Sequence, residues 1–261
     1  MRYLLSLTAV LAVFFSSCTK DAGPVTGGDF KGKLARVKSG TDISSEYFYN
    51  TAGQLVHWIS YVSTGVKSED VTRTYSNNKL VREDRLMNYS SSLTTPQYDT
   101  SYTIFSYNNN GLLQKTDTYN RNGHVSAASN SYNAQGQLIT SELTPGSNGG
   151  VGFYIRASYT YDANGNVQTE EYYNGSSAIT PVTITTRTTY EYDNKANPYQ
   201  HTWVMPFGVN RNNITKKTVK NFLLPGQPEN VSLITYQGYN ADGFPLQHTE
   251  NGAVFTYEYY R

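Results

Sequence analysis

The sequence predicts an all-β protein: an antiparallel meander of repeated hairpins, with about 12 to 14 strands, that forms a barrel-like or strongly curled sheet. The first observation is a heptapeptide, Tyr-Asn/Asp-x-x-Gly-x-Leu/Val, found at 49–55, 107–113, 119–125, 132–138 and 161–167. Such a repeat predicts a repeated structural unit. The second observation is the composition, with 24 Tyr and abundant Gly, Asn, Ser and Thr among 261 residues. Tyr and Thr fit a half-buried pleated surface, so this composition favours strands.

The chemistry of the heptapeptide is that of a hairpin turn. Its Asn can accept a hydrogen bond from the backbone two residues further on, and its Gly supplies a left-handed backbone conformation. We therefore expect a type I turn closed by a bulge at Gly, with Tyr ending one strand and Leu or Val opening the next. The glycines expected to close such turns are Gly53, Gly111, Gly123, Gly136, Gly165 and Gly243.

Residues 1–18 have the features of a targeting segment. Arg2 precedes an apolar run, 3–15, that is too short for a comfortable transmembrane helix. Small residues then precede Cys18, the only Cys in the chain, in a pattern that resembles a bacterial lipobox. The resemblance implies cleavage before Cys18 and its lipidation, although Phe15 stands where Leu or Val is usual. The alternative is an ordinary secretory signal with a chance Cys.

Residues 19–29 are small and polar without periodicity, which predicts a flexible tether. Thr19 resembles the residue that directs lipoproteins to the outer membrane, and the periplasmic and external faces both stay open. Residues 30–261 are expected to form a single β-repeat domain. Its predicted strands are 33–37, 46–49, 55–62, 71–75, 80–86, 101–107, 112–119, 125–132, 138–143, 153–161, 167–173, 181–192, 219–224, 231–239, 246–250 and 254–260.

Some connections differ from the repeat. Asn77 and Asn78 suit a two-residue turn with positive φ angles. The segment 194–213 departs from the pattern of alternating strands and turns. We expect it to include a short helical turn and to form a feature on the regular sheet. Its aromatic side chains make it the candidate ligand-binding region, with Tyr199, Trp203 and Phe207 as the residues. The Tyr side chains of the repeat are expected to pack over their own hairpins.

Two stretches resemble known families. Tyr161 to Val167 resembles the Tyr-Asp repeat of the RHS family, whose long arrays build β-shells in bacterial toxins and teneurins; the other copies mostly carry Asn in place of Asp. Residues 190–199 resemble a motif of Bacteroidota lipoproteins of unknown function that are described as having a porin-like β fold. The resemblance implies an architecture and no activity. This chain has too few repeats to enclose a toxin cargo.

The sequence offers little for catalysis or cofactors. A net charge of +1 gives no electrostatic reason to expect nucleic acid, and a single Cys excludes an internal disulfide or a multi-cysteine metal site. The four His residues lack metal-ligand spacing, and no nucleophile elbow, phosphate loop or dinucleotide fingerprint is present. Asp162 to Asn166 matches only the start of a calcium loop, and the hairpin explains the same residues. We expect no metal and no cofactor.

The expected function is that of a lipid-anchored cell-envelope protein, attached to the outer membrane through Cys18 and acting as a non-catalytic binding or structural module. A glycan or an envelope protein is the candidate partner. One alternative is a secreted glycan-acting enzyme with a pair of carboxylates assembled by folding. The other is a small outer-membrane pore, against which the polar run 183–189 argues, because it has little to face lipid.

Overall fold

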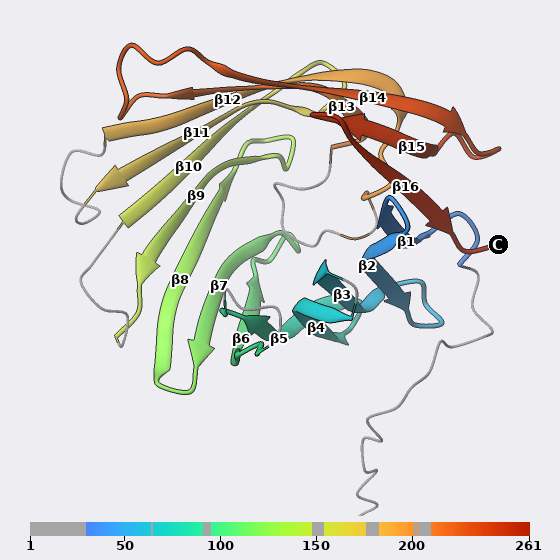
Figure 1. Cartoon of the computed structure of the whole chain (residues 1–261). Coiled ribbons are helices and arrows are strands. Elements are labelled where there is room, and N and C mark those ends of the chain that lie inside the picture. The colour runs from blue at the N-terminus through green and yellow to red at the C-terminus, as the bar shows by residue number, and fades with distance from the viewer. Residues whose placement is uncertain are drawn as a thin grey trace, which may run out of the picture.

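The computed structural model describes residues 30–63, 65–90, 95–147, 154–175, 183–200, 202 and 210–261. The targeting segment with Cys18 and the tether lie outside the described residues. Within these residues, sixteen antiparallel strands form one closed barrel (Figure 1). The predicted all-β meander of hairpins is therefore confirmed. The described part of the chain contains no helix that could cross a membrane.

The strands follow one another around the barrel in chain order. Their bounds are β1 Leu34–Ser39, β2 Asp42–Tyr49, β3 Leu55–Ser63, β4 Val66–Ser76, β5 Lys79–Asn88, β6 Tyr98–Tyr107, β7 Leu113–Asn120, β8 Gly123–Tyr132, β9 Leu138–Pro145, β10 Tyr154–Tyr161, β11 Val167–Gly175, β12 Thr183–Ala196, β13 Asn212–Asn221, β14 Asn230–Tyr239, β15 Pro245–Glu250 and β16 Ala253–Tyr259. The number of strands, sixteen, exceeds the expected 12 to 14. Each of the sixteen ranges predicted from the sequence nevertheless overlaps one strand. β13 begins at Asn212 instead of residue 219.

The first and last strands close the barrel. β1 pairs with β16 in a register that runs from Leu34 opposite Tyr259 to Ser39 opposite Phe255. Every other strand pairs only with its neighbours in the chain, so the ring contains no crossover. Closure removes the unpaired edges that an open sheet of this size would expose.

Most of the heptapeptides form one type of turn at one end of the barrel. In the first copy, Asn50 Oδ1 accepts hydrogen bonds from the backbone N–H of Ala52 and Gln54, at 3.1 and 3.0 Å. Gly53 has φ of 73° and donates its N–H to the carbonyl of Asn50 at 2.8 Å. The same pattern of bonds recurs around Asn108, Asn133, Asp162 and Asn240.

The remaining heptapeptide, 119–125, behaves differently. It lies at the β7–β8 connection, and since successive connections of a meander alternate between ends, it lies at the opposite end from the five Asn-type turns. Asn120 pairs with Gly123 across only two residues, and Gly123 has φ of 109°. The two-residue turn predicted at Asn77 and Asn78 is confirmed, with φ of 49° and 61°.

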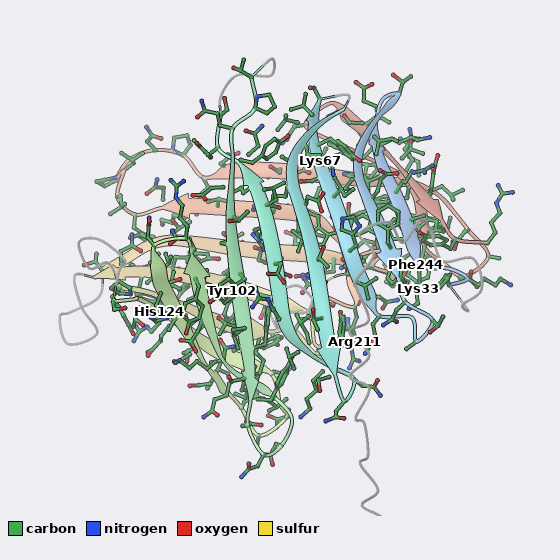
Figure 2. All side chains as sticks on the ribbon, turned by 90° about the horizontal axis from the view of Figure 1, so that it is seen from below. Lys33, Lys67, Tyr102, His124, Arg211 and Phe244 are labelled. Carbon is green, nitrogen blue, oxygen red and sulfur yellow. The ribbon has the colours of Figure 1, made fainter. Side chains whose placement is uncertain are left out.

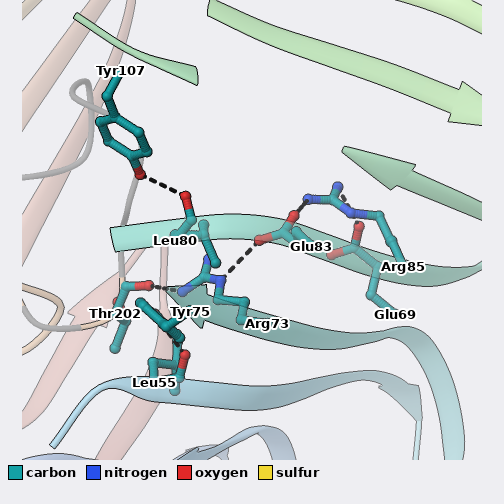
Figure 3. Close-up of polar contacts among 9 residues, drawn as sticks. All are labelled: Leu55, Glu69, Arg73, Tyr75, Leu80, Glu83, Arg85, Tyr107 and Thr202. Atoms are coloured by element: carbon teal, nitrogen blue, oxygen red, sulfur yellow. Dashed lines mark hydrogen bonds and ion pairs between the residues drawn. The ribbon is translucent and has the colours of Figure 1, made fainter. Parts of the chain in front are cut away.

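The Tyr residues at the Asn-turn end link neighbouring strands. Tyr107 on β6 donates its hydroxyl to the carbonyl of Leu80, the second residue of β5, at 2.8 Å (Figure 3). From the sequence we expect each Tyr to pack over its own hairpin. The hydroxyl instead bonds to the preceding strand. The equivalent bonds are Tyr49 to Leu34, Tyr75 to Leu55, Tyr132 to Leu113, Tyr161 to Leu138, Tyr192 to Val167 and Tyr259 to Pro245. We call this set the tyrosine ladder.

The two faces of the barrel wall have different chemistry. Many inward positions carry apolar and aromatic side chains, such as the buried cluster of Leu80, Phe105 and Leu113, and inward charged groups gather in the two cavities described below. Outward positions alternate with them and carry ion pairs between neighbouring residues or strands. These outward pairs are Arg36–Glu46, His57–Asp70, Arg82–Asp84, Lys115–Asp117, Arg187–Glu171 and Lys216–Glu191.

The tyrosine ladder predicts a stability effect. Tyr107→Phe removes one hydroxyl and leaves the Leu80 carbonyl without that donor, so the free energy of unfolding should fall by about 1 kcal/mol. Urea unfolding followed by tryptophan fluorescence measures it. Tyr98→Phe is the matched control, because the Tyr98 hydroxyl is exposed and lies 3.5 Å from its acceptor. Equal losses in the two variants would contradict a structural role for the ladder.

Candidate functional site: a tyrosine-lined cavity

The connection between β12 and β13 enters the barrel. Asn197 and Thr202 are buried, and the carbonyl of Thr202 accepts a hydrogen bond from Arg73 Nη1 of β4 at 2.8 Å (Figure 3). The Tyr199 ring contacts the Tyr257 ring edge-on, with 5.9 Å between centroids. β4 and β12 lie half-way around the ring from each other. The described residues of the connection therefore lie in the interior of the barrel and not on its outer surface.

The structure describes one of the three candidate ligand-binding residues of this connection. Tyr199 lies inside the barrel, and Trp203 and Phe207 fall outside the described residues. The predicted helical turn is a hydrogen-bonded turn in the described part: Gln200 N–H donates to the Asn197 carbonyl, and Thr202 N–H to that of Tyr199. No described residue of the segment is helical.

Asparagine side chains hold both ends of the connection. Asn210 Oδ1 accepts from the Val167 N–H at 2.9 Å, and Asn197 Nδ2 donates to the Asn210 carbonyl at 2.9 Å. Asn166 is fully buried, and its Oδ1 accepts from the N–H groups of Arg211 and Asn212 at 2.8 and 3.1 Å. From the sequence we predict no role for these asparagines. The available signal was Asn at the sixth heptapeptide position, where the other copies carry Gln, Leu or His.

A cavity of about 360 Å³ lies between this connection and the inner faces of β10 to β16. Tyr side chains form much of its wall, and two carboxylates and two amides are its other principal polar groups. None of the described lining residues is Lys or Arg. The residues are Tyr159, Val167, Glu170, Tyr190, Asn197, Tyr199, Asn210, Ile214, Ile234, Tyr236, His248, Glu250 and Tyr257.

Glu170 is held by tyrosine hydroxyls. Its Oε1 accepts from the Tyr172 hydroxyl at 2.9 Å, and its Oε2 from the Tyr190 hydroxyl at 2.8 Å. Burial raises the pKa of Tyr190 well above its ordinary value, and the nearby Glu170 charge raises it further. Burial and the same charge also raise the pKa of Tyr159 and Tyr172. These phenols stay protonated at neutral pH and serve as donors around the carboxylate.

His248 is buried in the same cavity. Its Nδ1 lies 2.8 Å from the Tyr257 hydroxyl, and its ring stacks on Phe255 with 4.6 Å between centroids. Burial lowers the pKa of His248 below its ordinary value, so the ring is neutral at pH 7. The formal charges on the cavity wall are therefore the two carboxylates, Glu170 and Glu250.

A second cavity of about 490 Å³ lies against β3 to β11 and contains a charge network. Arg73 Nε lies 2.8 Å from Glu83 Oε2, and Arg85 bridges Glu83 and Glu69 at 2.8 and 3.0 Å (Figure 3). The side chains of Arg73 and Glu83 are only 8% and 9% exposed. Arg73, Arg85 and Glu83 line the cavity, and Glu69, which lies outside its lining, brings the network to two positive and two negative groups.

The outer face also carries aromatic rings, which Figure 2 shows around Tyr102 and His124. The Tyr102 and Tyr119 rings stack at 5.0 Å, the Arg82 guanidinium covers Tyr102 at 4.1 Å, and the His124 ring lies 5.0 Å from Tyr119. These side chains cover one another's faces. They form a cross-strand stack and leave no open aromatic platform of the kind that binds a sugar ring.

The turn glycines take the backbone conformation that the sequence predicts. Gly53, Gly111, Gly136, Gly165 and Gly243 have φ between 73° and 84° in the Asn-type turns, and Gly123 lies in the tighter turn described above. The described residues contain no cluster of three or more His, Cys, Asp or Glu side chains that could hold a metal ion.

Comparison with known proteins gives similarities of structure alone. No protein-family model matches the chain, and no curated protein matches it in sequence. A porin-like protein from Bacteroides uniformis is 12% identical with a TM-score of 0.46, over 83% of this chain and 90% of that one. A porin-like protein from Bacteroides vulgatus is 11% identical with a TM-score of 0.44, over 87% and 98%. The Photorhabdus luminescens Tc holotoxin pore is 13% identical with a TM-score of 0.22, over 80% and 15%.

The charge network predicts a strong dependence on Glu83. Glu83→Gln leaves buried Arg73 without its carboxylate, and the free energy of unfolding should fall by about 3 kcal/mol. Glu191→Gln is the control, because Glu191 forms an ion pair on the outer face and its side chain is 65% exposed. That variant should lose less than about 1 kcal/mol. Urea unfolding of both variants makes the comparison, and similar losses would contradict the assigned burial.

Proposed function

We propose that this protein is a non-catalytic binding barrel of the bacterial cell envelope that holds a small ligand in its interior. A lipid on Cys18 tethers it to the outer membrane. The observation that carries the proposal is the contrast between a charged outer wall and a tyrosine-lined cavity within. Tyr199 is the described contact residue for the ligand, and Trp203 and Phe207 belong to the same connection.

The outer wall supports contact with water and attachment through the tether. A barrel that crosses a bilayer presents an apolar belt to lipid, and Arg or Lys at the midplane costs about 2–4 kcal/mol. Here ion pairs occupy outward positions on β1 to β5, β7, β11 to β13 and β16, including Arg36–Glu46, Arg82–Asp84 and Arg187–Glu171. This distribution favours a tethered barrel over a pore formed by the strands.

A glycan-acting enzyme is the second candidate, because Glu170 and Glu250 line one cavity. Glycosidases use two carboxyl groups, one to donate a proton and one to act as nucleophile or base. Both oxygens of Glu170 accept hydrogen bonds from Tyr172 and Tyr190. A carboxylate held in this way is positioned as a fixed charge, which favours binding over catalysis.

The ligand test uses residues 29–261 in a glycan array, a polysaccharide pulldown and a small-molecule screen. Tyr199→Ala and Trp203→Ala should each weaken a specific interaction by about tenfold or more, since each removes aromatic contact area. Thr218→Ala, on the outer face of β13, is the matched control and should bind like the wild type. Binding that survives both aromatic substitutions would contradict the interior site, and turnover of a bound glycan would favour the enzyme.

The anchor test replaces Cys18 by Ser and follows incorporation of labelled palmitate during expression in a Gram-negative host. We expect the wild type to be labelled and recovered with outer membranes, and Cys18→Ser to lose the label and the membrane association. Ser17→Ala leaves the acceptor in place and is the control. A Cys18→Ser protein that stays tightly in the membrane would show attachment through another part of the chain.

A further inference from the structure

We infer that the tyrosine-lined cavity binds a small organic cation, such as a quaternary ammonium group. The inference rests on the proposed function, an interior that holds a small ligand, and names the chemical class of that ligand. It is carried by the uncompensated negative charge of the cavity and by the aromatic composition of its wall.

The charged side chains among the described lining residues are both carboxylates. Glu170 and Glu250 are the acids, and among the described residues neither forms an ion pair with Lys, Arg or His. The partners of Glu170 are tyrosine hydroxyls, which donate hydrogen bonds without supplying a positive charge. His248, the remaining titratable base of the wall, is buried against Phe255 and Tyr257.

Two basic side chains of neighbouring elements, Lys217 and Arg73, form no ion pair with these carboxylates. Lys217 lies opposite Tyr190 in the β12–β13 register and so on the same, inner face of the sheet. It is exposed to solvent, is not among the described lining residues and forms no ion pair with Glu170 or Glu250. Arg73 reaches the connection that bounds the cavity, and Glu83 compensates its charge. A ligand that brings one positive charge would therefore supply what the cavity lacks.

The wall suits an organic cation better than an inorganic one. Five Tyr rings, those of Tyr159, Tyr190, Tyr199, Tyr236 and Tyr257, line the cavity. The faces of such rings attract Lys-like, Arg-like and quaternary ammonium cations, and the attraction grows when water is excluded. An inorganic divalent ion needs several oxygen ligands at short range, and no metal-binding cluster occurs among the described residues.

The wall also disfavours a neutral polyol as ligand. A sugar needs donors and acceptors that are free to meet its hydroxyls. Of the lining hydroxyls, that of Tyr190 is engaged with Glu170 and that of Tyr257 with His248. A quaternary ammonium group makes no such demand, because it donates no N–H hydrogen bond. A volume of about 360 Å³ accommodates a molecule the size of choline.

The test titrates choline chloride into the full chain, purified in detergent, by isothermal titration calorimetry at fixed ionic strength. The neutral isostere 3,3-dimethylbutan-1-ol has nearly the same shape without the charge, and glucose represents a polyol. We expect saturable binding of choline and at least about tenfold weaker binding of the isostere. Glu170→Gln should weaken choline binding by about tenfold or more, and outward Glu191→Gln should leave it unchanged.

Urea unfolding of each variant separates loss of the charge from loss of the fold. If Glu170→Gln does not fold, Glu250→Gln supplies the same comparison from another strand. Equal affinity for choline and its isostere, or full affinity in a folded variant lacking either carboxylate, would overturn the inference. Glucose binding without choline binding would overturn the inference and leave the proposed binding function intact. No binding of choline, and no hit in the glycan and small-molecule screens, would overturn both.

Discussion

The hydrogen-bonded pairing of β1 with β16 is the constraint on which the rest of the structure depends. It converts a chain of hairpins into a closed ring, so alternate residues of each strand are committed to either the interior or the solvent. A one-residue slip would turn the outward ion pairs inward. The tyrosine ladder supports the same register, because each hydroxyl joins two neighbouring strands at the end where no turn connects them.

The closed ring leaves an interior that the side chains of the strands do not fill, and Tyr199 and Thr202 of the β12–β13 connection occupy part of it. Arg73 meets this connection from the opposite wall and is compensated by Glu83. On the other side, Glu170 is surrounded by tyrosine hydroxyls and has no basic partner among the described residues. The two halves of the interior thus differ electrostatically, one balanced and one negative. We therefore propose that the ligand binds in the negative half.

The turn chemistry was predictable where it depends on a few adjacent residues. Asn50 satisfies backbone groups two and four residues away, and the same pattern identifies the other Asn-type turns. The prediction was wrong in one respect at 119–125, where the same letters form a tighter turn at the opposite end. The spacing explains it: Tyr119 follows Tyr107 by the length of one strand, whereas the copies at one end recur after two or more strands. A local motif does not record which end of the barrel it occupies.

The sequence by itself determined the strand content, the turns and the all-β class, because these arise from period-two alternation and from bonds within a few residues. The tertiary structure alone decided that the sheet closes, that Tyr199 lies inside and that Glu170 meets Tyr190 across neighbouring strands. Arg73 and Thr202 are the clearest example. They are 129 residues apart in the chain, and their hydrogen bond forms across the barrel interior only after the strands between them have formed half of the ring. Closure creates such contacts, and no short pattern of residues encodes them.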